Sequence, residues 1–405
     1  MPPPEQPTPK PDTLPRPVDP APVRVPRPTP PPKPRLLAGV RLAFVGDINL
    51  GTLTLPDGVP ADSGRGLFAD AASALVGDLV IGNFEGVLGD SGTTYKCGRE
   101  GVRIGGTPPP TPPPEPPKPA RRRREPKPGP PRTCYAFLTP THLAPRLREA
   151  GFTHLNLANN HANDFGPEAR ALTESTFDSL ELGHYGPLGR IAIDTVRRAD
   201  SLTAVALVGF TTYPYAYDLL DIARSAAVVD SVRRLADLVV VTFHGGGEGT
   251  RALHVPEAAE SLANEPRGEL RRWARAVVDA GADVVVGHGP HVLRGIEFYR
   301  GRPIVYSLGN FLTYRGFNLS GPLGITGVLQ IEVGAGRCLR RARLVPMVQL
   351  PGVGVTPDST RSALDLVRQL SEEDFGPAAA RIEPDGTIVP PSDEPPTHCV
   401  PAHSS

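Results

Sequence analysis

Short apolar runs alternate with helical patterns along most of the chain, and polar residues follow many of the apolar runs. Examples of apolar runs are DLVIG at 78–82, DLVVVTF at 237–243 and DVVVG at 283–287. Runs of this length, bounded by turn residues, are typical of buried strands. Their alternation with helical patterns predicts an α/β fold in which the polar residues lie at the carboxyl ends of the strands.

The helical patterns are less regular than the strands. Residues 64–77 have apolar residues at helical spacing, beginning with Leu67 and Phe68, which predicts an amphipathic helix. Further helices are expected at 167–183, at about 225–236, at 267–281 and at about 359–371. The strands expected at 302–311, 327–333 and 340–349 are joined by short glycine-bearing links, which favours antiparallel pairing.

Proline is concentrated in residues 1–36 and 107–132, which hold more than half of the 51 prolines. Proline removes a backbone donor and these segments offer little apolar surface, so both are predicted to be disordered or polyproline II. The predicted organisation is an arm at 1–36, one domain at 37–390 with the insertion 107–132, and a flexible tail at 391–405. The run Arg121–Arg124 could hold a polyanion, but no aromatic residues interleave with it, which favours a solvated tip.

Charge and length narrow the class of protein only in part. Lys plus Arg and Asp plus Glu are equal at 43 each, so the net charge gives no reason to expect nucleic acid as a specific partner. No apolar run approaches the roughly 18 residues of a transmembrane helix. The N-terminus lacks the pattern of a secretory signal, which favours a cytoplasmic location or a true start further upstream. Cys97 and Cys134 flank the insertion and could form a disulfide, although two ordinary thiols are favoured.

Five predicted strands end in residues that can bind metal ions. These residues are Asp47 with Asn49, Asn83 with Glu85, Asn160 with His161, His244, and His288 with His291. Each group alone has an ordinary alternative, such as a turn cap or a satisfied interior histidine. Because α/β sheets place ligands beyond the carboxyl ends of their strands, we expect the five groups to converge on one crevice.

The chemistry of these residues indicates a catalytic metal site. Carboxylate, amide and imidazole groups without a thiolate suit Mn, Fe or Zn in a hydrolytic site. About six such ligands exceed the needs of one catalytic zinc ion, which predicts two divalent metal ions sharing an activated water. Asp164 and Glu248 could orient His161 and His244, respectively. The alternatives are a turn cap for Asp164 and a solvated loop residue for Glu248.

Several motifs carry a family resemblance. VGDINLG, GNFEG, LANNHANDFG, HGGGE and GHGPHV followed by YSLGNF resemble, in order and separation, those of the CapA family of bacterial poly-γ-glutamate capsule synthesis proteins. That family looks like a branch of the calcineurin-like metallophosphoesterases. The resemblance covers about residues 40–380 and implies a four-layer α/β/β/α sandwich of two mixed sheets, with two metal ions at the strand ends.

The resemblance also implies roles for single residues. Asp47 matches the first metal carboxylate, Glu85 the bridging carboxylate, and His161 the histidine that faces the scissile ester as general acid. The metal ligands implied in this way are Asp47, Glu85, Asn160, His244, His288 and His291. Asn49 stands where the superfamily usually has a histidine ligand, and Glu85 stands in place of an aspartate.

The function implied is metal-dependent hydrolysis of a phosphoester or related bond in capsule or envelope polymer metabolism. Its substrate would be a phosphoester or an anionic polymer, with other capsule-synthesis proteins as partners. One alternative is a non-catalytic accessory that binds or exports polymer and keeps metal only for structure. Another is an interaction protein whose proline arms bind partner domains. Retention of His161 and the ligands favours the enzyme, whereas Asn49 and Glu85 favour the accessory. The family is mostly envelope-associated, so the location stays open.

Overall fold

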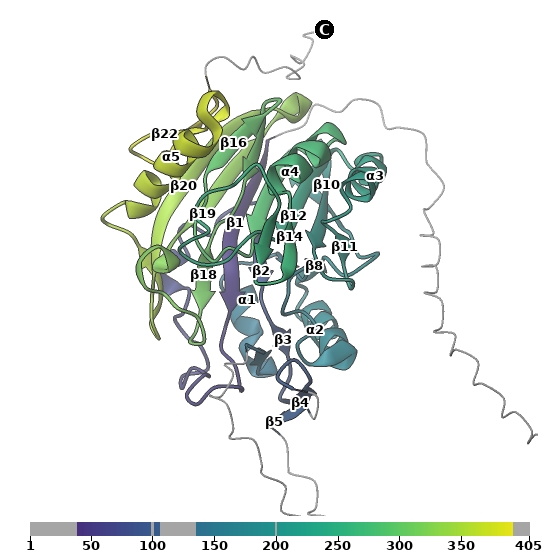
Figure 1. The fold of residues 1–405 in the computed structure, drawn as a ribbon, viewed down its shortest axis with the longest axis vertical. Coiled ribbons are helices and arrows are strands. Elements are labelled where there is room, and N and C mark those ends of the chain that lie inside the picture. Colours follow the sequence, from purple (N-terminus) through teal and green to yellow (C-terminus); the bar gives the residue numbers. More distant parts are fainter. Residues whose placement is uncertain (1–38, 99–100, 106–134, 199–200, 392–405) are drawn as a thin grey trace, which may run out of the picture. The chain divides into compact units, whose positions relative to one another are not determined.

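Two β-sheets lie face to face in the computed structural model, which describes residues 39–98, 101–105, 135–198 and 201–391 (Figure 1). The segments predicted to be disordered, 1–36 and 107–132 with the basic run, lie outside the described residues, as does the tail from 392 onward. Those predictions, and the domain limits drawn from them, therefore stay predictions.

The first sheet is mixed and has eight strands. They are β21 (Gly354–Pro357), β20 (Leu339–Leu350), β19 (Ile325–Val333), β1 (Val40–Asn49), β2 (Leu79–Phe84), β7 (His154–Asn156) and β8 (Gly183–Tyr185), with β18 (Asn310–Thr313) beside β1. From β1 to β8 the strands are parallel, whereas β1, β19, β20 and β21 pair antiparallel. The antiparallel pairing predicted near the C-terminus is confirmed for β19 and β20. It is wrong for the end of the strand predicted at 302–311, because a separate strand, β18, begins at Asn310 and runs parallel to β1.

The second sheet is also mixed and has seven strands. They are β11 (Tyr217–Asp218), β10 (Ser201–Thr211), β12 (Leu238–His244), β15 (Val284–His288), β17 (Arg302–Val305) and β16 (Ile296–Tyr299), with β9 (Ala192–Arg198) beside β10. β10, β12, β15 and β17 pair in parallel. β12 and β15 are buried along their whole length, which explains their continuous apolar runs. The chain passes from β17 in this sheet to β18 in the other, which is why β18 is not the antiparallel neighbour of β17.

The three largest groups of buried apolar side chains lie between the sheets and on the outer face of each sheet. Phe44, Val240 and Leu329 belong to the core between the sheets, and α5 (Ser362–Phe375) packs against that core. α1 (Pro145–Glu149) and α2 (Gly166–Ser179) cover the outer face of the first sheet. α3 (Ile222–Arg233) and α4 (Leu270–Asp279) cover the outer face of the second (Figure 1). The predicted four-layer α/β/β/α sandwich of two mixed sheets is confirmed.

The helix predicted at 64–77 is wrong, although its apolar face is correct. Only the single 3₁₀ turn η1 (Ala69–Ala71) forms there, flanked by irregular turns. Leu67 and Phe68 are buried as expected. Gly64 and Gly66 have φ of 72° and 81°, and this left-handed backbone prevents an α-helix from starting. The helix predicted at 267–281 begins later, at Leu270, because the residues before it form a strand.

Four small two-stranded sheets complete the described part of the chain. They are β3 (Val87–Leu88) with β6 (Leu138–Thr139), β4 (Ser91–Thr94) with β5 (Val102–Gly105), β13 (Glu260–Leu262) with β14 (Glu265–Gly268), and β22 (Arg381–Ile382) with β23 (Ile388–Val389). Cys97 follows β4 and is disulfide-bonded, so the expectation of an ordinary thiol is wrong for it; Cys134 lies outside the described residues. Among the described helices, none has the length and apolar character needed to span a membrane.

Candidate metal centre

Parallel pairing brings the polar residues of neighbouring strands together at their carboxyl ends. Asp47 of β1 pairs with Asn83 of β2, and His244 of β12 pairs with His288 of β15. Glu85 directly follows β2. All five residues are buried. Strand pairing therefore brings together three polar residues of the first sheet and, separately, two histidines of the second. The sequence predicted that these strand ends share one crevice.

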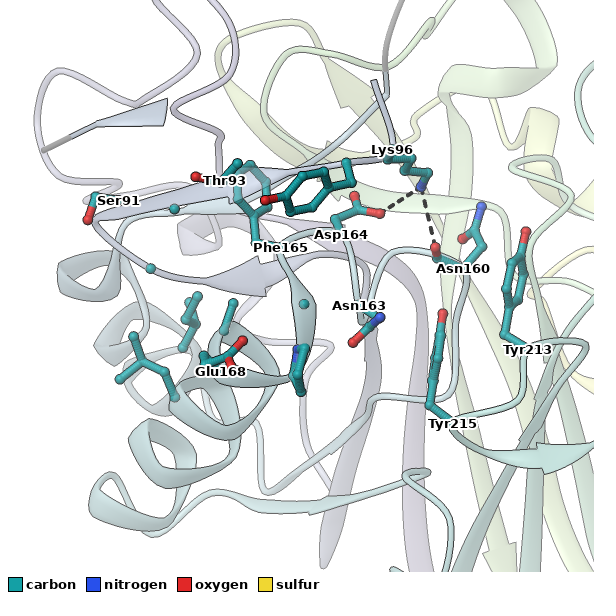
Figure 2. Close-up of a pocket in the computed structure, with 18 residues that line it drawn as sticks. Ser91, Thr93, Lys96, Asn160, Asn163, Asp164, Phe165, Glu168, Tyr213 and Tyr215 are labelled. Carbon is teal, nitrogen blue, oxygen red and sulfur yellow. Dashed lines mark hydrogen bonds and ion pairs between the residues drawn. The ribbon is translucent and has the colours of Figure 1, made fainter. Parts of the chain in front are cut away.

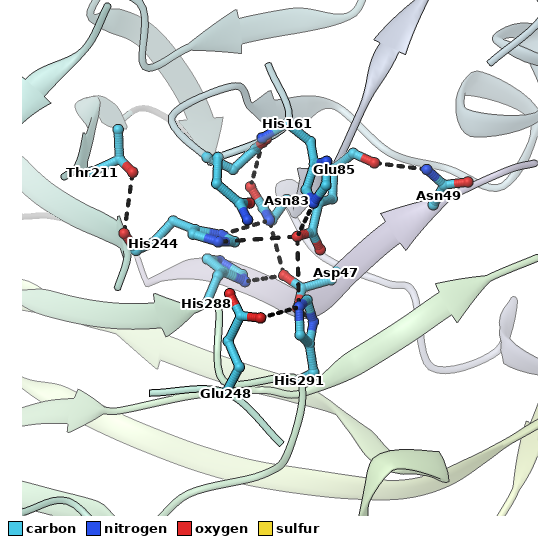
Figure 3. Close-up of polar contacts among 12 residues, drawn as sticks. Asp47, Asn49, Asn83, Glu85, His161, Thr211, His244, Glu248, His288 and His291 are labelled. Carbon is cyan, nitrogen blue, oxygen red and sulfur yellow. Dashed lines mark hydrogen bonds and ion pairs between the residues drawn. The ribbon is translucent and has the colours of Figure 1, made fainter. Parts of the chain in front are cut away.

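Asp47 is the centre of a polar network (Figure 3). Its Oδ2 atom lies 3.0 Å from Nδ1 of His291, and its Oδ1 atom lies 3.6 Å from Nδ1 of His288. The amide of Asn83 also donates to Oδ1 at 2.9 Å. Burial alone would raise the pKa of Asp47, but the two histidines outweigh burial and hold that pKa far below its usual range. Asp47 is therefore a carboxylate.

Glu85 faces three histidines. Its Oε1 atom lies 3.8 Å from Nε2 of His161, 3.8 Å from Nε2 of His291 and 4.0 Å from Nε2 of His244. Neither oxygen of Glu85 has a hydrogen-bond partner among the described residues. Burial, followed by the charge of Asp47, raises the pKa of Glu85 well above its usual value. Buried polar atoms are almost always paired, so these two oxygens lack a partner that a cation would supply.

Other buried ligand atoms near Glu85 also lack partners within the described part of the chain. They are Nε2 of His244, Nδ1 of His288 and Oδ1 of Asn160. Oxygen and imidazole nitrogen atoms of this kind are the ligands of catalytic divalent ions. Asp47, Glu85 and His291 further offer ligand atoms that all lie within 4.8 Å of one another. The residues therefore fit a divalent metal ion.

The charge states of the histidines agree with this fit. Burial, reinforced by the charge of Arg267, lowers the pKa of His244 well below its usual value, so His244 is neutral, as a metal ligand must be. Burial would also lower the pKa of His291, but the charges of Glu85 and Asp47 raise it to about 10. His291 therefore carries a positive charge next to Asp47, a role that a bound cation would take over.

His161 reaches Glu85 from the loop after β7. Its Nδ1 atom lies 2.7 Å from Oδ2 of Asp164, and its backbone N–H donates to Oδ1 of Asn159 at 3.0 Å. Burial lowers the pKa of His161, and Asp164 partly opposes that shift. The backbone N–H of Phe137 donates to the same carboxylate at 2.8 Å, which fixes Asp164 in turn. Asp164 thus holds the ring with Nε2 toward Glu85.

The sequence did not indicate Lys96, which contacts both His161 and Asp164. Its Nζ atom lies 2.7 Å from Oδ1 of Asp164 and 3.2 Å from Nδ1 of His161, and it donates to the carbonyl of Asn160 at 3.4 Å. Lys96 follows β4 in the β4–β5 hairpin, and no motif marks it. Only the placement of that hairpin reveals the lysine.

Two candidates occupy places other than those the sequence suggested. The side chain of Asn49 donates to the backbone carbonyl of Glu85 at 2.8 Å and accepts from the N–H of Gly51 at 3.1 Å, so it acts on the backbone. The expectation that Glu248 orients His244 is wrong. Its Oε2 atom lies 3.9 Å from Nε2 of His291 instead, because the glycine-rich loop carries Glu248 past His244.

Two cavities open at the site. A cavity of about 480 Å³ is lined by His161 and His291, among others. A second cavity, of about 740 Å³, lies beside the start of α2 (Figure 2). Lys96, Asn160 and Tyr213 line both cavities, so the larger one adjoins the metal centre at these three residues. The space beside the candidate ligands therefore extends from His161 and His291 toward the start of α2.

The chain is similar to proteins of capsule synthesis. Residues 120–315 match the family model described as Bacterial capsule synthesis protein PGA_cap. Capsule biosynthesis protein CapA from Bacillus anthracis is 32% identical over 191 residues, which is 42% of each chain. PGA biosynthesis protein CapA from Bacillus subtilis (strain 168) is 34% identical over 188 residues, covering 42% of this chain and 45% of that protein. The chain thus spans less than half the length of these two relatives.

A solved structure is also similar. It is a putative 5'-nucleotidase from Staphylococcus aureus in complex with alpha-ketoglutarate, with a TM-score of 0.33 and 14% identity over 57% of this chain and 44% of that chain. The resemblance to the CapA family seen in the motifs is confirmed by the sequence matches. The chain is therefore similar to the CapA proteins, and its residues 120–315 match the family model of bacterial capsule synthesis proteins.

Proposed function

We propose that the protein is a metal-dependent hydrolase of the metallophosphoesterase type that acts in capsule or related envelope polymer metabolism. One observation carries the proposal. The oxygens of Glu85 and ring nitrogens of His244 and His288 are buried without hydrogen-bond partners among the described residues. They lie beside a histidine that is already oriented by a carboxylate. The link to capsule polymer rests on the relatives.

The proposed metal ligands are the six residues that the sequence suggested. They are Asp47, Glu85, Asn160, His244, His288 and His291, and they would hold two divalent ions, Mn, Fe or Zn. Such ions, when bound, supply an activated water and neutralise charge on substrate oxygens. Oδ1 of Asn160 is buried without a partner among the described residues, and Asn160 lines both cavities.

The proposed catalytic residues are His161 and Asp164. In this proposal the N–H at Nδ1 of His161 donates a hydrogen bond to Asp164, and Nε2 faces Glu85 and the reacting group. A protonated His161 would donate from Nε2 to the departing oxygen of the substrate. Lys96, between the two cavities, would bind an anionic group of a phosphoester or anionic polymer.

A non-catalytic accessory of polymer assembly is the second candidate. Asn49 favours it, because this side chain binds the backbone of Glu85 and does not supply the ligand that the superfamily usually has there. In that case the metal would only hold the two sheets together, and other capsule-synthesis proteins would be the partners.

One experiment separates the two candidates. Bound Mn, Fe and Zn are measured by elemental analysis, and 4-nitrophenyl phosphate and bis(4-nitrophenyl) phosphate are assayed with the wild type and His161→Ala. His142→Ala, at an exposed histidine outside the site, is the control. A general acid contributes about 10²- to 10⁴-fold, so His161→Ala should lose at least about 100-fold in turnover while its metal content is unchanged. Full metal content without His161-dependent turnover would favour the accessory.

A further inference from the structure

The glycine-rich loop that follows β12, residues 245–249, is fixed by the β13–β14 hairpin. The N–H of Gly246 donates to the carbonyl of Arg267 at 2.9 Å, and Nε of Arg267 donates back to the carbonyl of Gly246 at 2.9 Å. The N–H of Gly247 donates to Oε2 of Glu260 at 2.8 Å. A loop of glycines would otherwise be free to adopt many conformations, so these bonds select one.

Two buried arginines support this arrangement. Arg294 is fully buried and forms a bidentate ion pair with Glu260, at 3.0 and 2.7 Å. Arg267 is also fully buried, and its Nη2 atom donates to Oε1 of Glu248 at 2.7 Å. Buried ion pairs add little net stability because of the desolvation they require. Their presence around a short loop therefore indicates that the position of Glu248 matters for more than folding.

Glu248 is aimed at the metal centre (Figure 3). Arg267 occupies its Oε1 atom, and its Oε2 atom lies 3.9 Å from Nε2 of His291. The same Nε2 atom lies 3.8 Å from Oε1 of the unpaired Glu85. Ligand atoms about 2.1 Å from one ion are about 3 to 4 Å apart, so both separations suit neighbouring ligands.

Strand β1 supplies a single side chain to the candidate metal centre. Asn49 binds the backbone, so β1 supplies Asp47 alone. We propose that Glu248, positioned by Arg267, is a further ligand of the candidate metal centre. This inference rests on the metal-binding part of the proposed function. It adds a carboxylate from the second sheet to a set whose other carboxylates come from the first.

Metal affinity tests the inference without any assay of turnover. Metal-free protein is titrated with Mn²⁺, and free Mn²⁺ is followed by electron paramagnetic resonance. Glu248→Gln should weaken at least one Mn²⁺ site by about tenfold or more. Glu265→Gln is the matched control. Glu265 lines the same cavity, but its Oε2 atom accepts from the hydroxyl of Tyr213 at 2.8 Å, so Mn²⁺ affinity should not change.

Variants of Arg267 separate positioning from charge. Arg267→Met should weaken the same Mn²⁺ site as Glu248→Gln, whereas Arg267→Lys should restore part of the affinity because it keeps a donor for Glu248. Thermal unfolding shows whether each variant is folded. If Arg267→Met does not fold, Glu248→Gln and its control decide alone.

The outcomes separate the inference from the proposed hydrolase. Wild-type affinity of Glu248→Gln for every Mn²⁺ ion would overturn the inference and leave the hydrolase intact. Weakened Mn²⁺ binding in Glu248→Gln, together with no turnover of either ester by the wild type, would support the ligand assignment and contradict the hydrolase. A wild type that binds no Mn²⁺ in this titration and contains no Mn, Fe or Zn by elemental analysis would overturn both.

Discussion

Nδ1 of His161 lies 2.7 Å from Oδ2 of Asp164, and this contact sets the orientation of the imidazole ring. Asp164→Asn keeps the shape but removes the charge that holds the Nδ1 proton. We expect kcat for bis(4-nitrophenyl) phosphate to fall about 10- to 100-fold with little change in KM, since orientation of the proton donor is lost and binding is not. Asp70→Asn, at an exposed residue of η1, should have wild-type kinetics. Unchanged kcat in Asp164→Asn would contradict the proposed role.

Glu85 is expected to provide much of the gain in stability that bound metal ions give. A ligand that binds only the folded state stabilises it by about 2.7 kcal/mol at 100 times its Kd. Glu85→Gln should lose most of the rise in Tm on addition of Mn²⁺. Without metal its stability should stay close to that of the wild type, because an amide replaces a buried carboxyl group whose pKa is already raised by burial. The same Mn²⁺-dependent rise in both proteins would refute the assignment of Glu85 as a ligand.

Unfolding of the protein can be followed by fluorescence, because the chain has one tryptophan. Trp273 is fully buried on the outer side of the second sheet, in edge contact with Phe210 and Phe243. Its fluorescence therefore reports unfolding without any label in the metal centre.

His154 should make the stability depend on pH. It is buried, and burial lowers its pKa below 6.5, with Asp194 opposing the shift. The unfolded chain therefore binds the proton more strongly, so this contribution to stability is complete above pH 6.5 and is lost as the pH falls below it. In His154→Gln the free energy of unfolding should fall less steeply from about pH 7 to about pH 5. The exposed His142→Gln should keep the wild-type slope; equal slopes in all three proteins would contradict the prediction.

The larger cavity should affect substrates according to their size. Leu172 lines this cavity on α2, and Ala171 beside it is exposed and does not line it. Leu172→Trp should lower kcat/KM for bis(4-nitrophenyl) phosphate about 5- to 10-fold relative to 4-nitrophenyl phosphate, because the added ring fills space needed by the larger ester. Ala171→Trp should leave that ratio unchanged. An unchanged ratio in Leu172→Trp would show that the larger ester does not use this cavity.

Local patterns explain the part of the fold that could be predicted. β12 and β15 are apolar along their whole length, so the sequence identifies them and the histidines at their ends. His161 and Asp164 are three residues apart in one loop, so their contact needs no knowledge of the rest of the chain. In residues 64–77 the apolar spacing identifies the buried face, but it does not reveal that two glycines adopt left-handed backbone.

The unpredicted contacts join parts of the chain that no local pattern connects. Lys96 reaches Asp164 only because the β4–β5 hairpin lies over the loop that follows β7. Glu248, in the loop after β12, approaches His291 and not His244. The buried Arg267, which belongs to the separate β13–β14 hairpin, holds Glu248 in that position. Spacing in the sequence carries no information about either route.

The polar residues of the metal centre are divided between the two sheets. Asp47 and Glu85 come from the ends of β1 and β2, whereas His244 and His288 come from the ends of β12 and β15. Asn83 already joins the halves, with its amide 2.9 Å from Asp47 and 3.4 Å from Nδ1 of His244. An ion bound by residues of both sheets would crosslink the two sheets. Metal binding should then slow hydrogen exchange in strands of both sheets together. The stability of the whole domain would therefore depend on the same ion that the proposed reaction uses.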